Sequence, residues 1–272
     1  MQISALPEVA PVSPPEGVRL ILANNPGPLS LAGTNTWILT GRADSSTIVI
    51  DPGPPLPEHL AAIRAAGTPA AIVLTHQHAD HSEAAPKLAA EYGVPIYAAL
   101  PELALHTTSL AEGDVIAHAG WELTVLATPG HTSDSVCLRI EDALFTGDTL
   151  LGGSTTIIAP PSGSLAEYFE TMKRLATLTN LPGLPGHGPA FSSVGVWAAR
   201  NAEYREERLA QLVDVYNREF RDPDSATLLG RVAAKTYGEN GAPVAAYIEE
   251  MTRAQLAFLA GRGDISSWTA VE

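Results

Sequence analysis

The sequence contains only one cysteine, Cys137, which rules out an internal disulfide framework. Cys137 lies in the apolar run 135–140, so we expect a buried thiol in a strand rather than a nucleophile. No apolar run approaches the ~20 residues that cross a membrane. Residues 1–17 are rich in proline and lack a basic segment followed by an apolar one. This pattern predicts no signal peptide and a reduced, cytoplasmic setting.

Positively charged residues are also scarce. The 16 Lys and Arg residues are outnumbered by 30 Asp and Glu residues, which gives a net charge of −14. No block of basic residues is present, so strong non-specific binding to nucleic acid is not expected, although local contacts at a cationic site remain compatible with this composition. An apolar content of 45% is enough for a packed core, and 272 residues suit one large domain with a small appendage.

Short apolar stretches alternate with turns and helical patterns over most of the chain. Strands are expected at 19–23, 36–40, 47–50, 70–74, 95–98, 123–127, 135–140 and 143–145. Helices are expected at 57–66, at 82–92 with Ser82 as the cap, and at 165–178. This alternation predicts an α/β fold whose functional side chains follow the carboxyl ends of strands.

The last part of the chain has a different pattern. Long helices are expected at 194–218, 225–237 and 244–261, with a turn at 238–241 and a closing strand at 265–271. We therefore divide the chain into a loose N-terminal arm (1–18), a catalytic domain (19–195) and a C-terminal helical unit (196–272).

Four separated fragments offer metal-binding side chains. They are 75–81 (THQHADH), 128–131 (TPGH), 145–148 (FTGD) and 185–188 (PGHG). Together they provide five histidines and two aspartates, and neutral imidazoles and carboxylates suit zinc and similar divalent cations. Three histidines and an aspartate within six residues are rare by chance, so we interpret the first fragment as functional.

The spacing indicates how these ligands divide between two cations. Alternate residues of an extended turn point to the same side, so His76 and His78 can share one cation, with His131 as a third ligand. The expected ligands of the second cation are Asp80, His81 and His187. Taken singly, His131 or His187 could be a solvated or capping histidine.

Asp148 has two carboxylate oxygens and is the candidate bridge between the cations, although it could also shape a turn after Gly147. Two cations ~3.5–4 Å apart can hold a hydroxide between them and lower the pKa of water from ~15.7 to ~7. Asp80 would orient this hydroxide and is our candidate catalytic residue. The fragments therefore predict a metal-dependent hydrolase.

Asp51 directly follows the expected strand 47–50. It either accepts an imidazole N–H and fixes the tautomer of a ligand, or shapes the turn before Pro52. His59, His106 and His118 lie outside the four fragments, and we expect them at surface or helix positions.

In this order, the motifs resemble those of the metallo-β-lactamase fold superfamily. Segments 25–28 (NPGP), 33–37 (GTNTW), 147–156 (GDTLLGGSTT) and 204–208 (YREER) are similar to its lactamase-β-2-like subgroup. The resemblance extends from about residue 19 to the C-terminus. It implies an αββα sandwich with the metals at one edge, followed by a small winged-helix-like unit.

The resemblance also implies a metal-dependent endonuclease acting on single-stranded RNA, and not a true β-lactamase. Arg205 and Arg208, three residues apart on an expected helix, would share a face and steer phosphates. The alternative is that both are solvated arginines. Thr155, in the segment after Asp148, is a further expected substrate contact.

Other functions fit the same ligands. A thioester hydrolase like glyoxalase II, acting on a small ester or thioester, is the second hypothesis. An inactive metal-binding scaffold and a mononuclear iron oxygenase are further alternatives. The expected metal is zinc, with manganese or iron as alternatives, and the expected state is a monomer or homodimer without membrane association.

Overall fold

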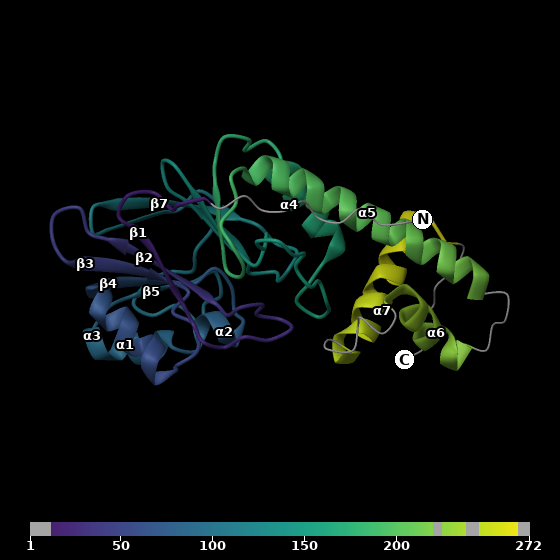
Figure 1. Ribbon diagram of the computed structural model, residues 1–272, viewed down its shortest axis with the longest axis horizontal. Helices are drawn as coiled ribbons and strands as arrows, with labels where there is room; N and C mark the ends of the chain where they lie inside the picture. Colours follow the sequence, from purple (N-terminus) through teal and green to yellow (C-terminus); the bar gives the residue numbers. More distant parts are fainter. Residues whose placement is uncertain (1–11, 220–224, 238–244, 266–272) are drawn as a thin grey trace.

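The computed structural model describes residues 12–219, 225–237 and 245–265. Two β-sheets lie face to face, helices cover their outer sides, and further helices extend from one end of the sandwich (Figure 1). Among the described residues, no helix is long and apolar enough to cross a membrane. The layers are those of the predicted αββα sandwich with a C-terminal helical appendage.

The first sheet carries two of the functional segments at one edge. Its strands, in spatial order, are β1 (Val18–Leu22), β2 (Asn35–Thr40), β3 (Ser46–Ile50), β4 (Thr68–Val73) and β5 (Ile96–Tyr97). β1, β2 and β3 are antiparallel neighbours, whereas β3, β4 and β5 run parallel. Because parallel strands end at the same edge, Asp51 after β3 and His76 after β4 are brought together.

The second sheet brings the remaining segments to the same end of the sandwich. Its strands, in spatial order, are β10 (Gly183–Pro185), β9 (Leu144–Gly147), β8 (Val136–Arg139), β7 (Trp121–Ala127) and β6 (Val115–His118). β9 and β10 run parallel and lead into Asp148 and His187. The sequence did not predict β6 and β10, because they have only 4 and 3 residues and no clear alternation.

Apolar residues at alternate positions of the strands form the core between the sheets. Trp121, Leu123 and Val125 of β7 are buried in this core, and Glu122 between them is exposed. Trp37 of β2 meets Phe145 of β9 edge-on, with ring centres 6.0 Å apart. Burial of these aromatic side chains contributes to the stabilisation that joins the two sheets.

Helices complete the outer layers. The first sheet packs against α1 (Pro57–Ala66) and α3 (Ala85–Tyr92), and the second against α4 (Leu165–Leu175) and α5 (Val194–Glu219). The short helix α2 (Ala79–Ser82) precedes α3. α1 begins with Pro57, whose fixed φ suits the first helical position. α4 is capped by Ser164, whose Oγ accepts from the backbone N of Glu167 at 3.3 Å.

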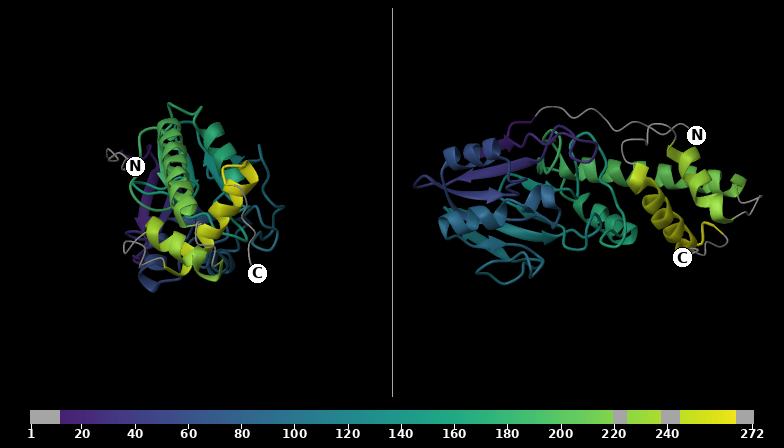
Figure 2. Two further views of the ribbon diagram at one scale, coloured as in Figure 1. Left: turned by 90° about the vertical axis from the view of Figure 1, so that its right-hand side faces the viewer. Right: turned by 90° about the horizontal axis from the view of Figure 1, so that it is seen from below.

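The long helix α5 runs from the sandwich into the appendage, where α6 (Ser225–Tyr237) and α7 (Ala245–Arg262) pack against it. Leu209, Val232 and Leu256 belong to their shared core. Phe169 of α4 stacks on Phe258 of α7 with ring centres 5.7 Å apart, which ties the appendage to the sandwich. Figure 2 shows these helices grouped beside one end of the sheets.

The expectation of a helix cap at Ser82 was wrong. α2 already begins at Ala79, and Ser82 is its last residue. The Oγ of Ser82 donates to the carbonyl oxygens of Gln77 and His78 at 3.1 and 3.0 Å, because the helix has started before it and its hydroxyl faces back along the turn.

Three sequence expectations fall partly or wholly outside the described residues. These are the arm 1–18, described only from residue 12, the turn 238–241, and the closing strand 265–271, described only at residue 265. Helix α5 begins at Val194 and crosses the expected boundary between 195 and 196. The division into three units stays a prediction.

Candidate metal centre

The seven predicted ligands come together at one edge of the sandwich. His76 and His78 follow β4, and His131 lies in the loop before β8. Nε2 of His76 and Nε2 of His131 each lie 2.9 Å from Nδ1 of His78. These three nitrogens form one group that can hold a metal ion.

Asp80, His81 and His187 form the second group. Nε2 of His187 lies 3.1 Å from Nε2 of His81 and 3.2 Å from Oδ2 of Asp80. The chain enters α2 at Ala79, between the first pair of ligands and the second. The change from extended to helical backbone explains how one short fragment serves two groups.

Asp148 lies between the groups. Its Oδ2 is 3.5 Å from Nε2 of His187 and 3.8 Å from Nε2 of His131, and its Oδ1 is 3.4 Å from Nε2 of His81. Oδ1 is buried and has no hydrogen-bond partner among the described residues. A buried carboxylate oxygen without a donor is costly, and a cation at this point would satisfy it.

The hydrogen bonds of the histidines identify which ring nitrogens carry protons. Nδ1 of His187 lies 3.0 Å from the carbonyl oxygen of Gly33, and Nδ1 of His131 lies 2.7 Å from that of Ile157. A carbonyl oxygen can only accept, so both Nδ1 atoms donate. In the neutral rings, Nε2 is then the nitrogen with the free lone pair, and it faces the groups described above, as metal ligation requires.

His76 reaches the same arrangement through Thr75. The hydroxyl of Thr75 donates to Oδ2 of Asp51 at 2.7 Å, so its oxygen is left to accept from Nδ1 of His76 at 3.1 Å. The lone pair of the His76 Nε2 therefore also points toward the first ligand group. Lone pairs that converge at about 3 Å repel one another unless a cation or a proton lies between them, so the donor set fits divalent metal ions.

The electrostatics of the site agree with this fit. Burial lowers the pKa of His76 well below its usual range and, despite Asp148, lowers that of His131 to about 4. Both rings are therefore neutral near pH 7. Burial also acts on His81, but the carboxylates of Asp148 and Asp51 outweigh it and raise the pKa of His81 to about 9. This negative field favours positive charge at the position where a cation would bind.

Asp51 accepts an imidazole N–H, as the first of the two interpretations of its position in the sequence requires. Its Oδ2 accepts from Nδ1 of His81 at 2.9 Å, and its Oδ1 accepts from the backbone N of Thr75 at 2.8 Å. The φ of Asp51 is 49°, so the residue also shapes the turn before Pro52. The two interpretations are therefore compatible.

His59 supports Asp51 from helix α1. The hydroxyl of Thr36 donates to the carbonyl oxygen of Asp51 at 2.6 Å and lies 2.9 Å from Nε2 of His59. We expected His59 at a surface or helix position, and it lies on a helix but is buried. His106 is exposed, and His118 is half-buried with Nε2 2.7 Å from the hydroxyl of Tyr97.

The segment 33–37 contributes contacts that motif spacing alone did not reveal. The hydroxyl of Thr34 donates to Oδ2 of Asp80 at 3.3 Å. Nδ2 of Asn35 and Nε1 of Trp37 both donate to the carbonyl oxygen of Pro185, at 2.9 and 3.0 Å. The segment thus holds Asp80 and the loop of the last ligand, and its similarity to the subgroup was the one signal that could have found it.

A pocket of about 650 Å³ opens over the two ligand groups. The apolar and aromatic residues of its wall are Pro28, Leu29, Leu31, Ala79, Leu151, Ile157, Ala159, Pro160 and Tyr247. Small polar residues, among them Asn25, Ser154 and Thr156, line it too. Thr155 and Glu250 of α7 line it as well. Within the described part of the chain, neither lysine nor arginine lines this pocket.

Arg205 and Arg208 lie outside this lining. Arg205 is buried, and its Nη2 donates to the carbonyl oxygen of Thr156 at 2.8 Å. Arg208 donates from Nη1 to Oε1 of Gln211 at 3.0 Å and is half-buried. The alternative that both arginines are solvated is therefore not what the structure shows. A direct role of either arginine in phosphate binding stays a prediction.

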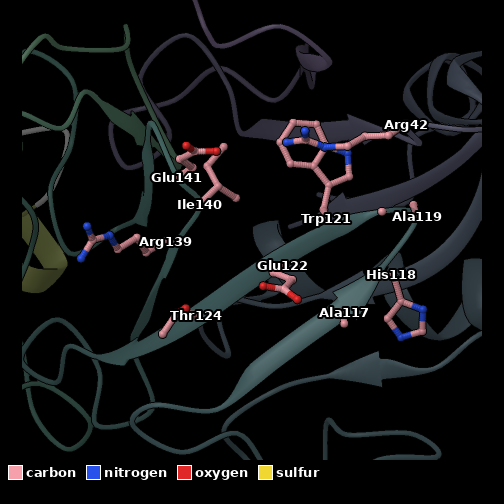
Figure 3. Close-up of a pocket in the computed structure, with 11 residues that line it drawn as sticks. Arg42, Ala117, His118, Ala119, Trp121, Glu122, Thr124, Arg139, Ile140 and Glu141 are labelled. Atoms are coloured by element: carbon pink, nitrogen blue, oxygen red, sulfur yellow. The ribbon is translucent and has the colours of Figure 1, made fainter.

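A second hollow, of about 680 Å³, lies over β7 and β8 (Figure 3). The guanidinium carbon of Arg42 lies 4.4 Å from the ring centre of Trp121, and Glu122 and Arg139 project from neighbouring strands. None of the seven ligands lines this hollow, so the candidate centre is the pocket beside Asp148.

An αββα sandwich that gathers these histidines and aspartates at one edge is the structure of a metal-dependent hydrolase. The family model of the metallo-beta-lactamase superfamily matches residues 30–187, which include all seven predicted ligands. The chain belongs to this superfamily.

Individual relatives extend beyond the matched region. The atrochrysone carboxyl ACP thioesterase of Aspergillus fumigatus is 32% identical over 78% of this chain and 68% of its own. A beta-lactamase-like protein 2 homolog of Caenorhabditis elegans is 33% identical over 77% of this chain and 76% of its own. The crystal structure of a metallo-beta-lactamase family protein from Thermus thermophilus has a TM-score of 0.75 at 18% identity, over 91% of this chain and 94% of that one, and so matches in fold.

Proposed function

We propose that the protein hydrolyses an acyl thioester whose acyl group is apolar and uncharged. The observation that carries the proposal is the wall of the pocket beside the ligands, which combines apolar side chains with small uncharged polar ones and, among the described residues, contains no lysine or arginine. An apolar acyl chain would leave water on entering this pocket. Its carbonyl would then lie beside Asp148 and the two histidine groups.

The chain's own side chains have distinct roles in this proposal. Two divalent cations, zinc with manganese or iron as alternatives, would supply the Lewis acidity that activates water and polarises the carbonyl. His76, His78 and His131 would hold one cation, Asp80, His81 and His187 the other, and Asp148 both. Oδ2 of Asp80, contacted by the hydroxyl of Thr34 at 3.3 Å, would also accept a hydrogen bond from the attacking water and orient it. Thr155 would contact the substrate.

The thioesterase from Aspergillus fumigatus supports this reaction class, since its name describes hydrolysis of a thioester. The region that is 32% identical covers most of this chain. The pocket supports the same class on physical grounds, because a neutral thioester needs no cationic side chain to accompany it.

Single-stranded RNA, which the sequence resemblance implies, is the second candidate. Tyr247 at the pocket is 44% exposed and could stack on a base. Grooves that bind single strands normally carry positive charge along the nucleic-acid backbone, however, and the lining here includes the acidic Glu250. The thioester is therefore the favoured substrate class. The cytoplasmic location and the monomeric or dimeric state stay predictions.

The experiment compares substrates on protein reconstituted separately with Zn²⁺, Mn²⁺ and Fe²⁺. The thioester is octanoyl-N-acetylcysteamine, its matched control is the same thioester with a carboxylate at the far end of the acyl chain, and the nucleic acid is an end-labelled single-stranded RNA. We expect hydrolysis of the octanoyl thioester, much weaker hydrolysis of the carboxylated one, and intact RNA. RNA cleavage with both thioesters untouched would overturn the proposal.

A further inference from the structure

Arg205 is a buried cation that lies close to the metal centre without lining it. It is on α5, only 4% exposed, and its Nη2 donates to the carbonyl oxygen of Thr156 at 2.8 Å. Its guanidinium carbon lies 5.4 Å from the ring centre of Tyr168. Burying a guanidinium costs free energy, and these two contacts offset part of that cost.

Thr156 connects Arg205 to a predicted metal ligand. The backbone of Thr156 and Ile157 is held at two consecutive carbonyl groups: the carbonyl oxygen of Thr156 accepts from Arg205, and the carbonyl oxygen of Ile157 accepts from Nδ1 of His131 at 2.7 Å. Oγ1 of Thr156 lies 2.8 Å from the same Nδ1. The orientation of the His131 ring therefore depends on the position of the backbone at Thr156 and Ile157.

Helix α4 holds the His131 loop from its other side. The carbonyl oxygen of Pro129 accepts from the hydroxyl of Thr171 at 2.7 Å. Gly130 touches the helix so closely that a Cβ there would lie 2.5 Å from Cα of Tyr168. Since Arg205 lies over the ring of Tyr168, it bridges both supports of the loop.

We propose that Arg205 is a positioning residue, which fixes the ring of His131 through Thr156 and so couples the C-terminal helices to the first ligand group. The inference rests on the metal-binding role given to His131 in the proposed function, and not on the substrate. Arg208 contacts other parts of the C-terminal helices: its Nη1 donates to Oε1 of Gln211 on its own helix, and its Nη2 donates to the carbonyl oxygen of Thr236 of α6.

The same helices also reach the pocket. α7 packs against both α4 and α5, and it places Tyr247 and Glu250 at the pocket wall. A shift of α5 would therefore move the pocket wall and the support of His131 together. Occupancy of the first ligand group and docking of the C-terminal helices should stabilise each other.

The test measures Co²⁺ binding, which involves no substrate. Co²⁺ is titrated into wild type, Arg205→Met and Arg205→Lys, and its visible absorption reports the ligand geometry. We expect Arg205→Met to weaken the binding of one Co²⁺ by roughly 10-fold or more and to change the spectrum, as loss of support behind a ligand usually does. Arg205→Lys should lie between, because an ammonium group can restore one donor to Thr156.

The matched control is Arg218→Met, an exposed arginine on the same helix, which should bind Co²⁺ like wild type. Thermal unfolding in EDTA separates a general loss of stability from an effect on the metal. If Arg205→Met does not fold, Arg205→Lys carries the test and must bind Co²⁺ more weakly than wild type. Wild-type affinity and spectrum in every folded variant would overturn the inference. A wild-type protein that binds no Co²⁺ would overturn the metal assignment and this inference with it, whereas thioester inertness alone would affect only the proposed substrate.

Discussion

Nδ1 of His81 donates to Oδ2 of Asp51 across 2.9 Å, and both side chains are buried. Thr75 holds the same carboxylate with its backbone N–H and its hydroxyl. Three donors therefore fix one carboxylate, and Nε2 of His81 is left facing His187 and Asp148. The tautomer of a ligand on α2 is set by a residue 30 positions earlier in the chain.

Asp51→Asn should weaken metal binding at the second ligand group. An amide cannot accept three hydrogen bonds as a carboxylate does, so the ring of His81 loses its fixed orientation. We expect the affinity for one cation to fall by about 10- to 100-fold, as measured by competition with a chromogenic chelator. Asp142→Asn, at an exposed position, is the control and should behave like wild type. Equal affinity in both variants would contradict the role of Asp51.

Asp148→Asn should have the largest effect on turnover. The substitution keeps the side-chain volume but removes the negative charge that faces His81, His131 and His187. We expect the metal content after gel filtration to fall from about two ions to about one, with nearly complete loss of hydrolysis. Elemental analysis and an activity assay check this. A variant with full metal content and ordinary turnover would show that Asp148 does not bridge.

The sequence predicted the parts of this site that depend on local patterns, and missed those that depend on contacts between residues far apart in the chain. The predicted ligands could be picked out because His76 and Asp148 each follow closely on an expected apolar strand, and His187 stands in a glycine-rich fragment. Strand ends at one edge of a sandwich converge, so local patterns were enough. The same reasoning placed α1 at its observed bounds of Pro57–Ala66.

The contacts that support the ligands could not be predicted in the same way. The burial of His59 and Arg205 depends on which elements pack over them, and these partners lie 23 and 49 positions away. Helical spacing predicted that Arg205 and Arg208 would share a face, either bordering the cleft or solvated. The structure buries the first and half-buries the second, because α4 and α6 pack against α5. Strand β10 was missed because its three residues end in proline and carry no pattern.

Metal affinity should rise with pH. The carboxylates around His81 outweigh its burial and raise its pKa to about 9, so below that pH a proton must leave before a cation can bind Nε2. The affinity of one cation should therefore increase roughly 10-fold per pH unit between about 7 and 9 and level off above. His131, with a pKa of about 4, is neutral throughout and adds no slope. Co²⁺ titrations at pH 7, 8 and 9 and constant ionic strength test this, and a flat profile would contradict it.

Cys137 should be unreactive in the folded protein. Burial raises the pKa of its thiol to about 11, and the side chain is fully buried. Thiolate is the reactive form, so at pH 8 a disulfide reagent such as DTNB should label the native protein very slowly. In guanidinium chloride the same reagent should titrate the single thiol of the chain at once. Rapid labelling of the native protein would mean that Cys137 is accessible.

Gly186→Ala should damage the metal centre directly, although glycine provides no ligand. A Cβ at this position would lie 2.5 Å from Oδ1 of Asp148 and 2.6 Å from Cε1 of His81. Neither neighbour can move without leaving its ligand group, so we expect weaker metal binding and a stability loss of about 1–3 kcal/mol.

Gly261→Ala is the matched control for this substitution. Gly261 lies in α7, and a Cβ there would meet nothing within 4 Å. Alanine favours a helix over glycine by about 0.5–1 kcal/mol, so this variant should unfold at a slightly higher temperature and bind metal normally. Thermal unfolding and metal analysis of the two variants separate a general cost of the added methyl group from its effect on the ligands. Normal metal binding in Gly186→Ala would show that the two ligands can yield, and that the close packing at Gly186 does not hold them in place.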